Sequence, residues 1–309
     1  MKKIVAVVGP TASGKTALSI ALAKKYSGEI ISADSMQFYR EMNIGTAKPD
    51  EAEKDGIIHR MIDILDIHET FSVSDFCRRC EVEAEEVISK GNLPIMCGGT
   101  GFYVDSFLEG VKFGEFENLP DFRDKMYMEL QEHGIDYLYE KLCKVDPENT
   151  VDRHNPKRVI RALEVYEATG KTIAQWNALS RLDEPKYDSL IIGLKFDDRE
   201  KLYERINLRV DKMLEAGLLS EVEHLIELGI RDTKTAGQAI GYKEFYPYID
   251  GVAGFDECVE KLKQESRKYA KRQMTWFKRN DKIKWITLDD KNQEDVFKLA
   301  CEYVDEFLR

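Results

Sequence analysis

The sequence predicts an α/β protein with a parallel sheet core and an inserted, mostly helical domain. Short apolar runs of strand length alternate with helical patterns over residues 1–100 and again after residue 188, which is typical of parallel sheets. Residues 116–187 carry helical patterns almost throughout. We therefore assign residues 1–115 and 188–309 to the core and residues 116–187 to a helical insertion domain.

The first 35 residues are expected to form a βαβ unit with a right-handed crossover. The apolar run Ile4–Val8 predicts a buried strand, and Thr16–Tyr26 predicts a helix that ends at Gly28. Glu29–Ala33 is rich in residues that favour strands and predicts the second strand.

The later elements follow from the same patterns. A helix at Ser74–Lys90, capped by Ser72 or Ser74 and closed by Gly91, leads into a third strand at Leu93–Cys97. In the insertion we expect helices at Asp121–His133, Ile135–Val145, Pro156–Thr169 and Thr172–Ser180. After it we expect strands at Leu190–Phe196 and Ile283–Thr287, and helices at Arg199–Glu215, Leu218–Leu228, Glu257–Lys278 and Glu294–Leu308.

The cysteine content and the apolar runs indicate the cellular compartment and whether the chain contacts a membrane. The six cysteines are scattered, and the close pair Cys77 and Cys80 lacks a second Cys or His pair at zinc-ligand spacing. The apolar run after Met1 stops at Gly9, short of a secretory signal, and no stretch approaches the length of a membrane span. We expect reduced thiols, a cytoplasmic location, no membrane partner and a monomer.

The net charge of −11 argues against a protein that coats nucleic acid without specificity. One segment differs, because residues 264–280 hold six basic residues and a single acidic one. An acidic chain with one concentrated basic segment indicates a localised anionic partner.

The turn between the first strand and the first helix fits the pattern G-x-x-x-x-G-K-[ST] in the strand and helix context that the pattern requires. It consists of Gly9, Pro10, Thr11, Ala12, Ser13, Gly14, Lys15 and Thr16. Such a P-loop surrounds a diphosphate with backbone N–H groups at a helix N-terminus. Lys15 adds a positive charge, and the Thr16 hydroxyl can ligate Mg²⁺. The core is therefore expected to resemble P-loop NTPases.

A phosphate-binding loop does not name the reaction. The guanine-reading pattern Asn-Lys-x-Asp is absent from the chain, while Phe196-Asp197-Asp198 imitates a Walker B site or simply ends a strand. Asp34 ends the second predicted strand at the sheet edge where parallel α/β proteins bind ligands. It is either a reactive carboxylate, such as a general base, or a cap on the next turn.

Seven further segments carry a resemblance when they are taken in order. They are Asp34-Ser35-Met36-Gln37, Gly45-Thr46-Ala47-Lys48-Pro49, Gly98-Gly99-Thr100-Gly101, Arg158 to Val165, Arg205 to Leu214, Ile240-Gly241-Tyr242-Lys243-Glu244 and Lys271-Arg272-Gln273-Met274-Thr275-Trp276. Together with the P-loop they resemble the tRNA dimethylallyltransferase family from Gly9 to about Trp276, which is nearly the whole chain.

The resemblance implies transfer of a dimethylallyl group from its diphosphate to the exocyclic N6 amine of the adenosine next to the anticodon, on its 3′ side. Asp34 matches the family's general base. Arg209 matches the family's arginine at the diphosphate, and Arg205 lies four residues earlier on the same predicted helix face. Lys15, Thr16 with Mg²⁺ and Arg209 would stabilise the leaving diphosphate.

The resemblance also implies a surface for the anticodon stem-loop of tRNA, mainly in the insertion domain. Thr100 matches the channel that receives the flipped adenine. The other matching positions are Asp34, Ser35, Met36, Gln37, Arg123, Lys157, Arg158, Val159, Ile160, Arg161, Gln238, Ala239, Ile240, Gly241, Tyr242 and Lys243. The basic segment Arg267–Arg279 interleaves aromatic residues, which fits either an RNA surface or a packed amphipathic helix.

Three alternatives remain at this point. A small-molecule or nucleotide kinase would share the P-loop, Mg²⁺ and a reactive carboxylate, but it would need a compact lid. An adenylate isopentenyltransferase would need no large RNA surface, and an RNA-binding NTPase switch would need no group transfer. The long helical insertion and the position of Asp34 favour the tRNA-modifying enzyme.

Overall fold

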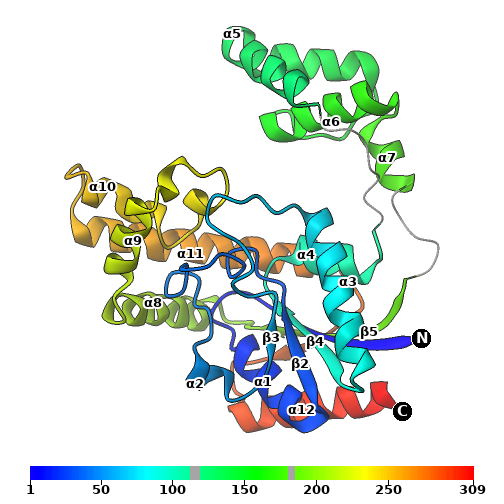
Figure 1. Cartoon of the computed structure of the whole chain (residues 1–309), viewed down its shortest axis with the longest axis vertical. Helices are drawn as coiled ribbons and strands as arrows, with labels where there is room; N and C mark the ends of the chain where they lie inside the picture. Colours follow the sequence, from blue (N-terminus) through cyan, green and yellow to red (C-terminus); the bar gives the residue numbers. More distant parts are fainter. Residues whose placement is uncertain (112–118, 180–184) are drawn as a thin grey trace. The chain divides into compact units, whose positions relative to one another are not determined.

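The computed structural model describes residues 1–111, 119–179 and 185–309 (Figure 1). Its contacts divide the chain into two compact units, Met1–Leu108 with Pro185–Arg309, and Glu109–Glu184. The domain boundary predicted between residues 115 and 116 and the helix end predicted at Ser180 lie outside the described residues. The assignment of residues 116–187 to a separate domain stays a prediction.

The first unit contains a six-stranded parallel sheet in the order β3-β2-β4-β1-β5-β6. The strands are β1 (Lys2–Val8), β2 (Gly28–Ser32), β3 (His59–Arg60), β4 (Leu93–Gly98), β5 (Tyr187–Lys195) and β6 (Ile283–Thr287). The predicted α/β fold class with a parallel sheet is therefore confirmed. Since all strands run in one direction, their carboxyl ends meet at one edge, where the P-loop follows β1.

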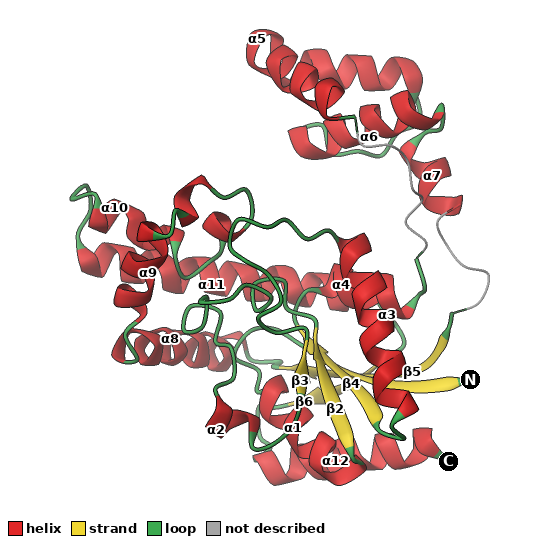
Figure 2. Ribbon diagram, viewed as in Figure 1, coloured by secondary structure: helices red, strands yellow, loops and turns green. Residues whose placement is uncertain are grey.

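Helices cover both faces of this sheet (Figure 2). The described helices of this unit are α1 (Lys15–Tyr26), α2 (Glu51–Lys54), α3 (Val73–Ser89), α4 (Gly101–Leu108), α8 (Arg199–Glu215), α9 (Leu218–Glu227), α10 (Tyr246–Ile249), α11 (Phe255–Phe277) and α12 (Gln293–Leu308). Short 3₁₀ turns lie at Ile230–Asp232, Ala236–Gln238 and Lys243–Phe245. Val5 and Val7 pack with α1 and α12, whereas Ile4, Ala6 and Val8 pack with α3 and α4. Burial on both faces explains the continuous apolar run of β1.

Local chemistry accounts for the ends of these helices. At the start of α3, the Ser72 hydroxyl accepts the N–H of Asp75 while the Asp75 carboxylate accepts the N–H of Ser72, so Ser72 is the cap. The expectation that Gly28 ends α1 is wrong. Ser27 takes the left-handed cap conformation with φ 51°, and Gly28 begins β2, where a Cβ would come within 2.9 Å of the Leu93 carbonyl oxygen.

The second unit shows only helices and connecting segments among its described residues (Figure 2). Its helices are α5 (Pro120–Val145), α6 (Pro156–Thr169) and α7 (Ile173–Leu179). The two helices predicted on either side of Gly134 form one element that is interrupted there, at φ 80° and ψ 175°. Met126, Leu138 and Leu142 of α5 pack against Val159 and Ile160 of α6.

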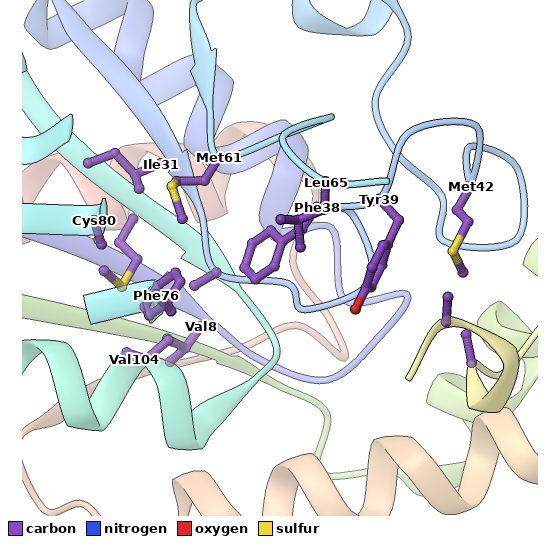
Figure 3. Close-up of a cluster of buried hydrophobic side chains, with 14 of the residues drawn as sticks. Val8, Ile31, Phe38, Tyr39, Met42, Met61, Leu65, Phe76, Cys80 and Val104 are labelled. Carbon is purple, nitrogen blue, oxygen red and sulfur yellow. The ribbon is translucent and has the colours of Figure 1, made fainter. Parts of the chain in front are cut away.

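A cluster of aromatic side chains anchors the segment that leaves β2 (Figure 3). Phe38 and Tyr39 are each 1% exposed, and the Phe38 ring lies 5.8 Å from that of Phe76 in α3. Residues 34–37 are therefore held between β2 and a buried anchor, which fixes their backbone at the sheet edge. In the described ranges, no helix has both the length and the apolar character that a membrane crossing requires.

Candidate active site

The P-loop lies between β1 and α1 and leads into the N-terminus of that helix. Gly9 has φ 154°, and a Cβ there would come within 2.8 Å of the Leu194 carbonyl oxygen, so only glycine fits without a shift. Gly14 precedes α1 with φ 85° and supplies no side-chain cap to the first N–H groups of the helix. These donors, with the positive end of the helix dipole, form a site for an anion.

Ser13 is a second feature of the loop that fits an anion. Its residue is 4% exposed, and its hydroxyl finds no hydrogen-bond partner among the described residues. Buried hydroxyl groups are normally hydrogen-bonded, and a phosphate oxygen in the loop would supply the partner.

Two cationic side chains face the same loop without an ion-pair partner in the part of the chain that the structure describes: Lys15 and Arg209. The Nζ of Lys15 lies 3.3 Å from the carbonyl oxygen of Pro10. Burial lowers the pKa of Lys15, and the charge of Arg209 lowers it further, while Asp34 acts in the opposite sense. Burial likewise lowers the pKa of Arg209 against the effect of Asp34. The positive charge is thus concentrated and is open to a diphosphate.

Arg205, one turn before Arg209 on α8, has a different role. Its Nε donates to the carbonyl oxygen of Ala12 at 3.0 Å, and its guanidinium lies over the Phe196 ring at 5.8 Å. Ala12 is a non-glycine residue with φ 62°. Arg205 therefore braces the P-loop at a residue in an uncommon backbone conformation.

Asp34 forms the strand-end cap that the sequence left open, and its role as a general base stays a prediction. Its Oδ1 accepts the N–H of Met36 at 3.1 Å, as in a strand-end cap. Its charge also acts on Lys15, Arg209 and Tyr269, which come from three different elements. One carboxylate oxygen therefore holds the turn and leaves Oδ2 for a proton from a ligand.

The loop Gly98–Gly101 packs directly beside Asp34. The N–H of Ser35 donates to the Thr100 hydroxyl at 3.3 Å, and the N–H of Thr100 donates to the Ala33 carbonyl oxygen at 3.3 Å. The glycines of this loop allow close packing against neighbouring protein atoms. A Cβ at Gly98, Gly99 or Gly101 would collide with Ala33, Gln273 or Trp276 respectively, so protein atoms occupy that space.

Tyr269 of α11 completes this side of the site. Its hydroxyl lies near the side chains of Thr100 and Gln273. Burial raises the pKa of Tyr269, and the negative charge of Asp34 raises it further. The Tyr269 hydroxyl therefore stays protonated near neutral pH and can serve as a hydrogen-bond donor at this junction.

The residues present fit a magnesium ion bound chiefly by its ligand. Thr16 lies in the first turn of α1, near the Cys97 thiol at the end of β4. Within the described ranges, no group of three or more His, Cys, Asp or Glu side chains is placed to hold a metal. Mg²⁺ commonly takes one protein oxygen, phosphate oxygens and water, which a lone hydroxyl beside a diphosphate site satisfies.

The segment Phe196-Asp197-Asp198 is not a Walker B site. The N–H groups of Asp197 and Asp198 both donate to the Asp289 carboxylate at 2.8 Å. Asp198 caps α8 by accepting the N–H of Glu200 at 2.9 Å. These carboxylates connect β5, α8 and the segment after β6, and they have a structural role.

The comparisons with known proteins decide the family. Residues 37–280 match the family model described as IPP transferase. This chain belongs to the IPP transferase family. The resemblance that the motifs carried and the transferase class are therefore confirmed.

The similarity to curated relatives extends over almost the whole chain. The tRNA dimethylallyltransferase of Bacillus subtilis (strain 168) is 47% identical over 287 residues, which are 92% of this chain and 90% of that protein. The tRNA dimethylallyltransferase of Caldanaerobacter subterraneus subsp. tengcongensis is 45% identical over 306 residues, which are 98% of this chain and 97% of that protein.

Solved structures agree with these relatives. The full-length tRNA isopentenylpyrophosphate transferase from Bacillus halodurans has a TM-score of 0.74 and 40% identity, covering 99% of this chain and 98% of its own. A eukaryotic dimethylallyltransferase acting on tRNA has a TM-score of 0.81 and 29% identity, covering 99% of this chain and 80% of its own.

The predicted RNA-binding positions in the core unit of this IPP transferase divide into exposed and buried sets. Gln238 is exposed, and Ser35, Met36, Ile240 and Lys243 are partly exposed. The side chain of Gln37 instead accepts from Ser32 at 3.0 Å and donates to Ala47 at 3.2 Å. Thr100 borders the catalytic junction, while the buried members are Ala239, Gly241 and Tyr242.

Glu221 of α9 is a residue that the sequence did not single out. Its carboxylate accepts the N–H groups of Asn43, Ile44 and Gly45 at 3.2, 2.8 and 3.0 Å, and the Tyr242 hydroxyl at 2.8 Å. The ring of Tyr242 fills the space that a side chain at Gly45 would need. A buried tyrosine and one carboxylate thus join two of the family motifs, and only their spatial proximity reveals the pair.

The insertion of this IPP transferase separates two pairs of predicted RNA contacts. Lys157 and Arg158 are exposed in the first turn of α6. Arg123 and Arg161 instead both bond the buried carboxylate of Glu164, with N–O distances of 2.6 and 2.8 Å. Val159 and Ile160 are 0% and 2% exposed and lie in the helical core, so almost none of their surface is open to RNA.

The basic segment of α11 has two faces. Lys268, Lys271, Arg272, Lys278 and Arg279 are exposed. Trp276 points inward and donates from Nε1 to the Asp105 carboxylate at 2.6 Å, while Arg279 stacks over its ring at 3.9 Å. The packed amphipathic helix is therefore present, and contact between its charged face and RNA stays a prediction.

Proposed function

We propose that this chain transfers the dimethylallyl group of dimethylallyl diphosphate to the N6 amine of the adenosine 3′-adjacent to the anticodon in tRNA, releasing diphosphate. The observation that carries the proposal is one juxtaposition at the sheet edge. In the P-loop region, Lys15 and Arg209 have no ion-pair partner among the described residues and lie close enough to Asp34 for its charge to act on both. Thr100 lies beside Asp34. Relatives over nearly the full chain are named tRNA dimethylallyltransferases.

The reaction requires a new C–N bond and the loss of a C–O bond. The N6 nitrogen attacks C1 of the dimethylallyl group, and the electron pair of the breaking C1–O bond leaves with the diphosphate. The N6 proton passes to the Asp34 carboxylate, because the amine is a poor nucleophile while its lone pair is delocalised into the purine. The atoms and charges balance without a further reactant.

The P-loop acts on the leaving group. Its backbone donors, the Ser13 hydroxyl, Lys15 and Arg209 are placed to stabilise the charge that grows on the diphosphate as the C1–O bond breaks. Bound Mg²⁺, held by Thr16 and the diphosphate, would neutralise part of the same charge. Arg205 keeps the loop in shape through Ala12.

On the acceptor side, the adenine would lie near Thr100 and Tyr269, and unstacking it is least costly in a single-stranded loop. The anticodon loop of tRNA provides such a base. The comparisons support neither the small-molecule kinase nor the adenylate isopentenyltransferase, since the relatives carry tRNA in their names. The cytoplasmic location and the monomeric state stay predictions from the sequence.

An acceptor comparison tests the proposal. The purified full chain is incubated with Mg²⁺ and dimethylallyl diphosphate labelled in the allyl group, together with unmodified tRNA, AMP, or ATP with small-molecule acceptors. We expect label in tRNA alone, on the adenosine 3′ to the anticodon after nuclease digestion. Label on AMP in preference to tRNA, or phosphate transfer from ATP, would contradict the proposal.

A further inference from the structure

Gln273 of α11 bonds two loops that the proposed reaction brings together. The residue is 5% exposed. Its Oε1 accepts the N–H of Thr11 at 2.8 Å, and its Nε2 donates to the carbonyl oxygen of Gly99 at 3.0 Å. A single buried carboxamide thus connects the P-loop after β1 with the loop between β4 and α4.

Gly99 is matched to this carboxamide. A Cβ at Gly99 would stand 2.0 Å from Nε2 of Gln273, a distance at which the amide must move. The glycine therefore lets the amide reach the backbone of the loop. Both ends of the amide are used, one as acceptor and one as donor, which sets its orientation.

The neighbours of Gln273 on α11 belong to the acceptor side of the site. Tyr269, one turn earlier, lies near the side chains of Thr100 and Gln273. Trp276, three residues later, bonds Asp105 of α4. Gln273 is itself neutral and buried behind the two loops, so it holds other groups and does not transfer a proton.

We propose that Gln273 is a positioning residue that sets the separation between the departing diphosphate and the incoming adenine amine. This inference rests on the proposed function, in which the diphosphate lies in the P-loop and the amine lies between Asp34 and Thr100. Each loop can bind its own ligand without the cross-link. The reaction between the two ligands depends on their distance, and a misplacement of about 1 Å can lower a rate by about 10²-fold.

Two variants and one control test this role in the full chain. Gln273→Met keeps a side chain of similar length and removes both hydrogen bonds. Gln273→Glu keeps the acceptor for the Thr11 N–H. It replaces the donor to Gly99 with a carboxylate oxygen, which the Gly99 carbonyl oxygen repels. Gln264→Met makes the same exchange at an exposed position of the same helix. The measurements are the single-turnover transfer rate at saturating donor and tRNA, the Kd for inorganic diphosphate, and the midpoint of thermal unfolding.

We expect the single-turnover rate of Gln273→Met to fall by about 10²-fold, with diphosphate affinity and the unfolding midpoint near those of the unsubstituted chain. The rate of Gln273→Glu falls as well, and the control is unchanged. An unaltered single-turnover rate in Gln273→Met overturns the proposal. So does a variant that loses only diphosphate affinity, or one whose rate falls together with its midpoint of thermal unfolding.

If Gln273→Met does not fold, Gln273→Glu decides by the same criteria. Failure of the unsubstituted chain to transfer label to tRNA is a separate result that contradicts the proposed function itself. A full rate in Gln273→Met with normal transfer by the unsubstituted chain contradicts only the positioning role.

Discussion

Two groups of cationic side chains in this protein differ in how their charge is balanced. In the core unit, Lys15 and Arg209 face the P-loop and have no ion-pair partner among the described residues. In the helical unit, Arg123 and Arg161 share the buried carboxylate of Glu164. Burial alone would raise the pKa of Glu164, but bonds and charges from the two arginines lower it below its ordinary range.

This difference in charge balance indicates which arginines are available to bind a substrate. An unbalanced and partly buried cation gains most from a bound anion, whereas an arginine already bonded to a buried carboxylate would have to break that contact first. We therefore assign Arg209 to the leaving group and Arg123 and Arg161 mainly to the stability of their helices. Lys157 and Arg158 remain as the free cations of α6 for a phosphate backbone.

The largest expected effect is at Asp34, whose charge acts on the core cations. Asp34→Asn preserves size and removes the proton acceptor, so single-turnover transfer should fall by about 10²–10⁴-fold. Binding of diphosphate and tRNA, measured by titration, should be retained. A nearly normal rate would remove Asp34 from the role of general base.

Arg209→Ala is expected to lower the single-turnover rate by about 10²–10³-fold, because it removes a charge that stabilises the leaving diphosphate. Arg205→Ala on the same helix is the matched comparison, and we expect a smaller loss because Arg205 acts through Ala12. Equal losses in the two variants would show that Arg209 has no special relation to the diphosphate.

Removing Arg123 from its pair with Glu164 tests whether this arginine stabilises the helical unit. Arg123→Ala should lower the local stability of α5 and α6 by about 1–2 kcal/mol, a value reduced because the arginine is partly exposed. Hydrogen exchange of the full chain measures this, with Arg153→Ala as control, since the Arg153–Asp136 pair is exposed on both sides. A larger effect in the control would contradict the assignment.

The same cluster predicts a pH dependence. Because the folded-state pKa of Glu164 is depressed, its contribution to stability is present above the unfolded-state pKa of about 4.3 and is lost as the pH falls through the lower, folded-state value. Amide protection in α5 and α6 should therefore fall below roughly pH 4.3. In Arg123→Ala the folded-state pKa of Glu164 lies closer to the unfolded-state value, so the total loss of protection on acidification should be smaller. A loss of the same size in both proteins would contradict this.

The smallest effect is expected at the free cations of α6. Arg158→Ala should weaken tRNA binding a few-fold and reduce the slope of log K against log salt by about 0.7–0.9. Lys144→Ala, an equally exposed cation on α5, is the control. Titrations at several salt concentrations compare them, and an unchanged slope in Arg158→Ala would remove that residue from the RNA surface.

Elements with a strong local pattern were predictable from the sequence. The helix Arg199–Glu215 and the strand Ile283–Thr287 match residue by residue, because an aspartate cap or an apolar run marks their ends. The strand His59–Arg60 was missed, because two polar residues at the sheet edge show no hydrophobic periodicity. The helix Gly101–Leu108 was also missed, because it is short and directly follows a glycine turn.

The candidate site divides in the same way. The P-loop and Asp34 have local signatures, at a strand-to-helix turn and at a strand end. Gln273 and Glu221 contact partners 262 and 176–178 positions away along the chain, and no local pattern encodes such contacts. A weak signal existed for Gln273, which is an uncharged residue on the inward face of an otherwise basic helix, four positions after Tyr269.

The central claim is that the P-loop holds a leaving diphosphate and not a phosphate that is transferred. Dimethylallyl diphosphate carrying one label in the allyl group and another in the diphosphate tests this directly with tRNA as acceptor. The account predicts allyl label in tRNA and an equal amount of free diphosphate, both formed more slowly by the same factor in Asp34→Asn. Phosphorus label in the RNA, or turnover that consumes ATP in place of the diphosphate donor, would contradict it.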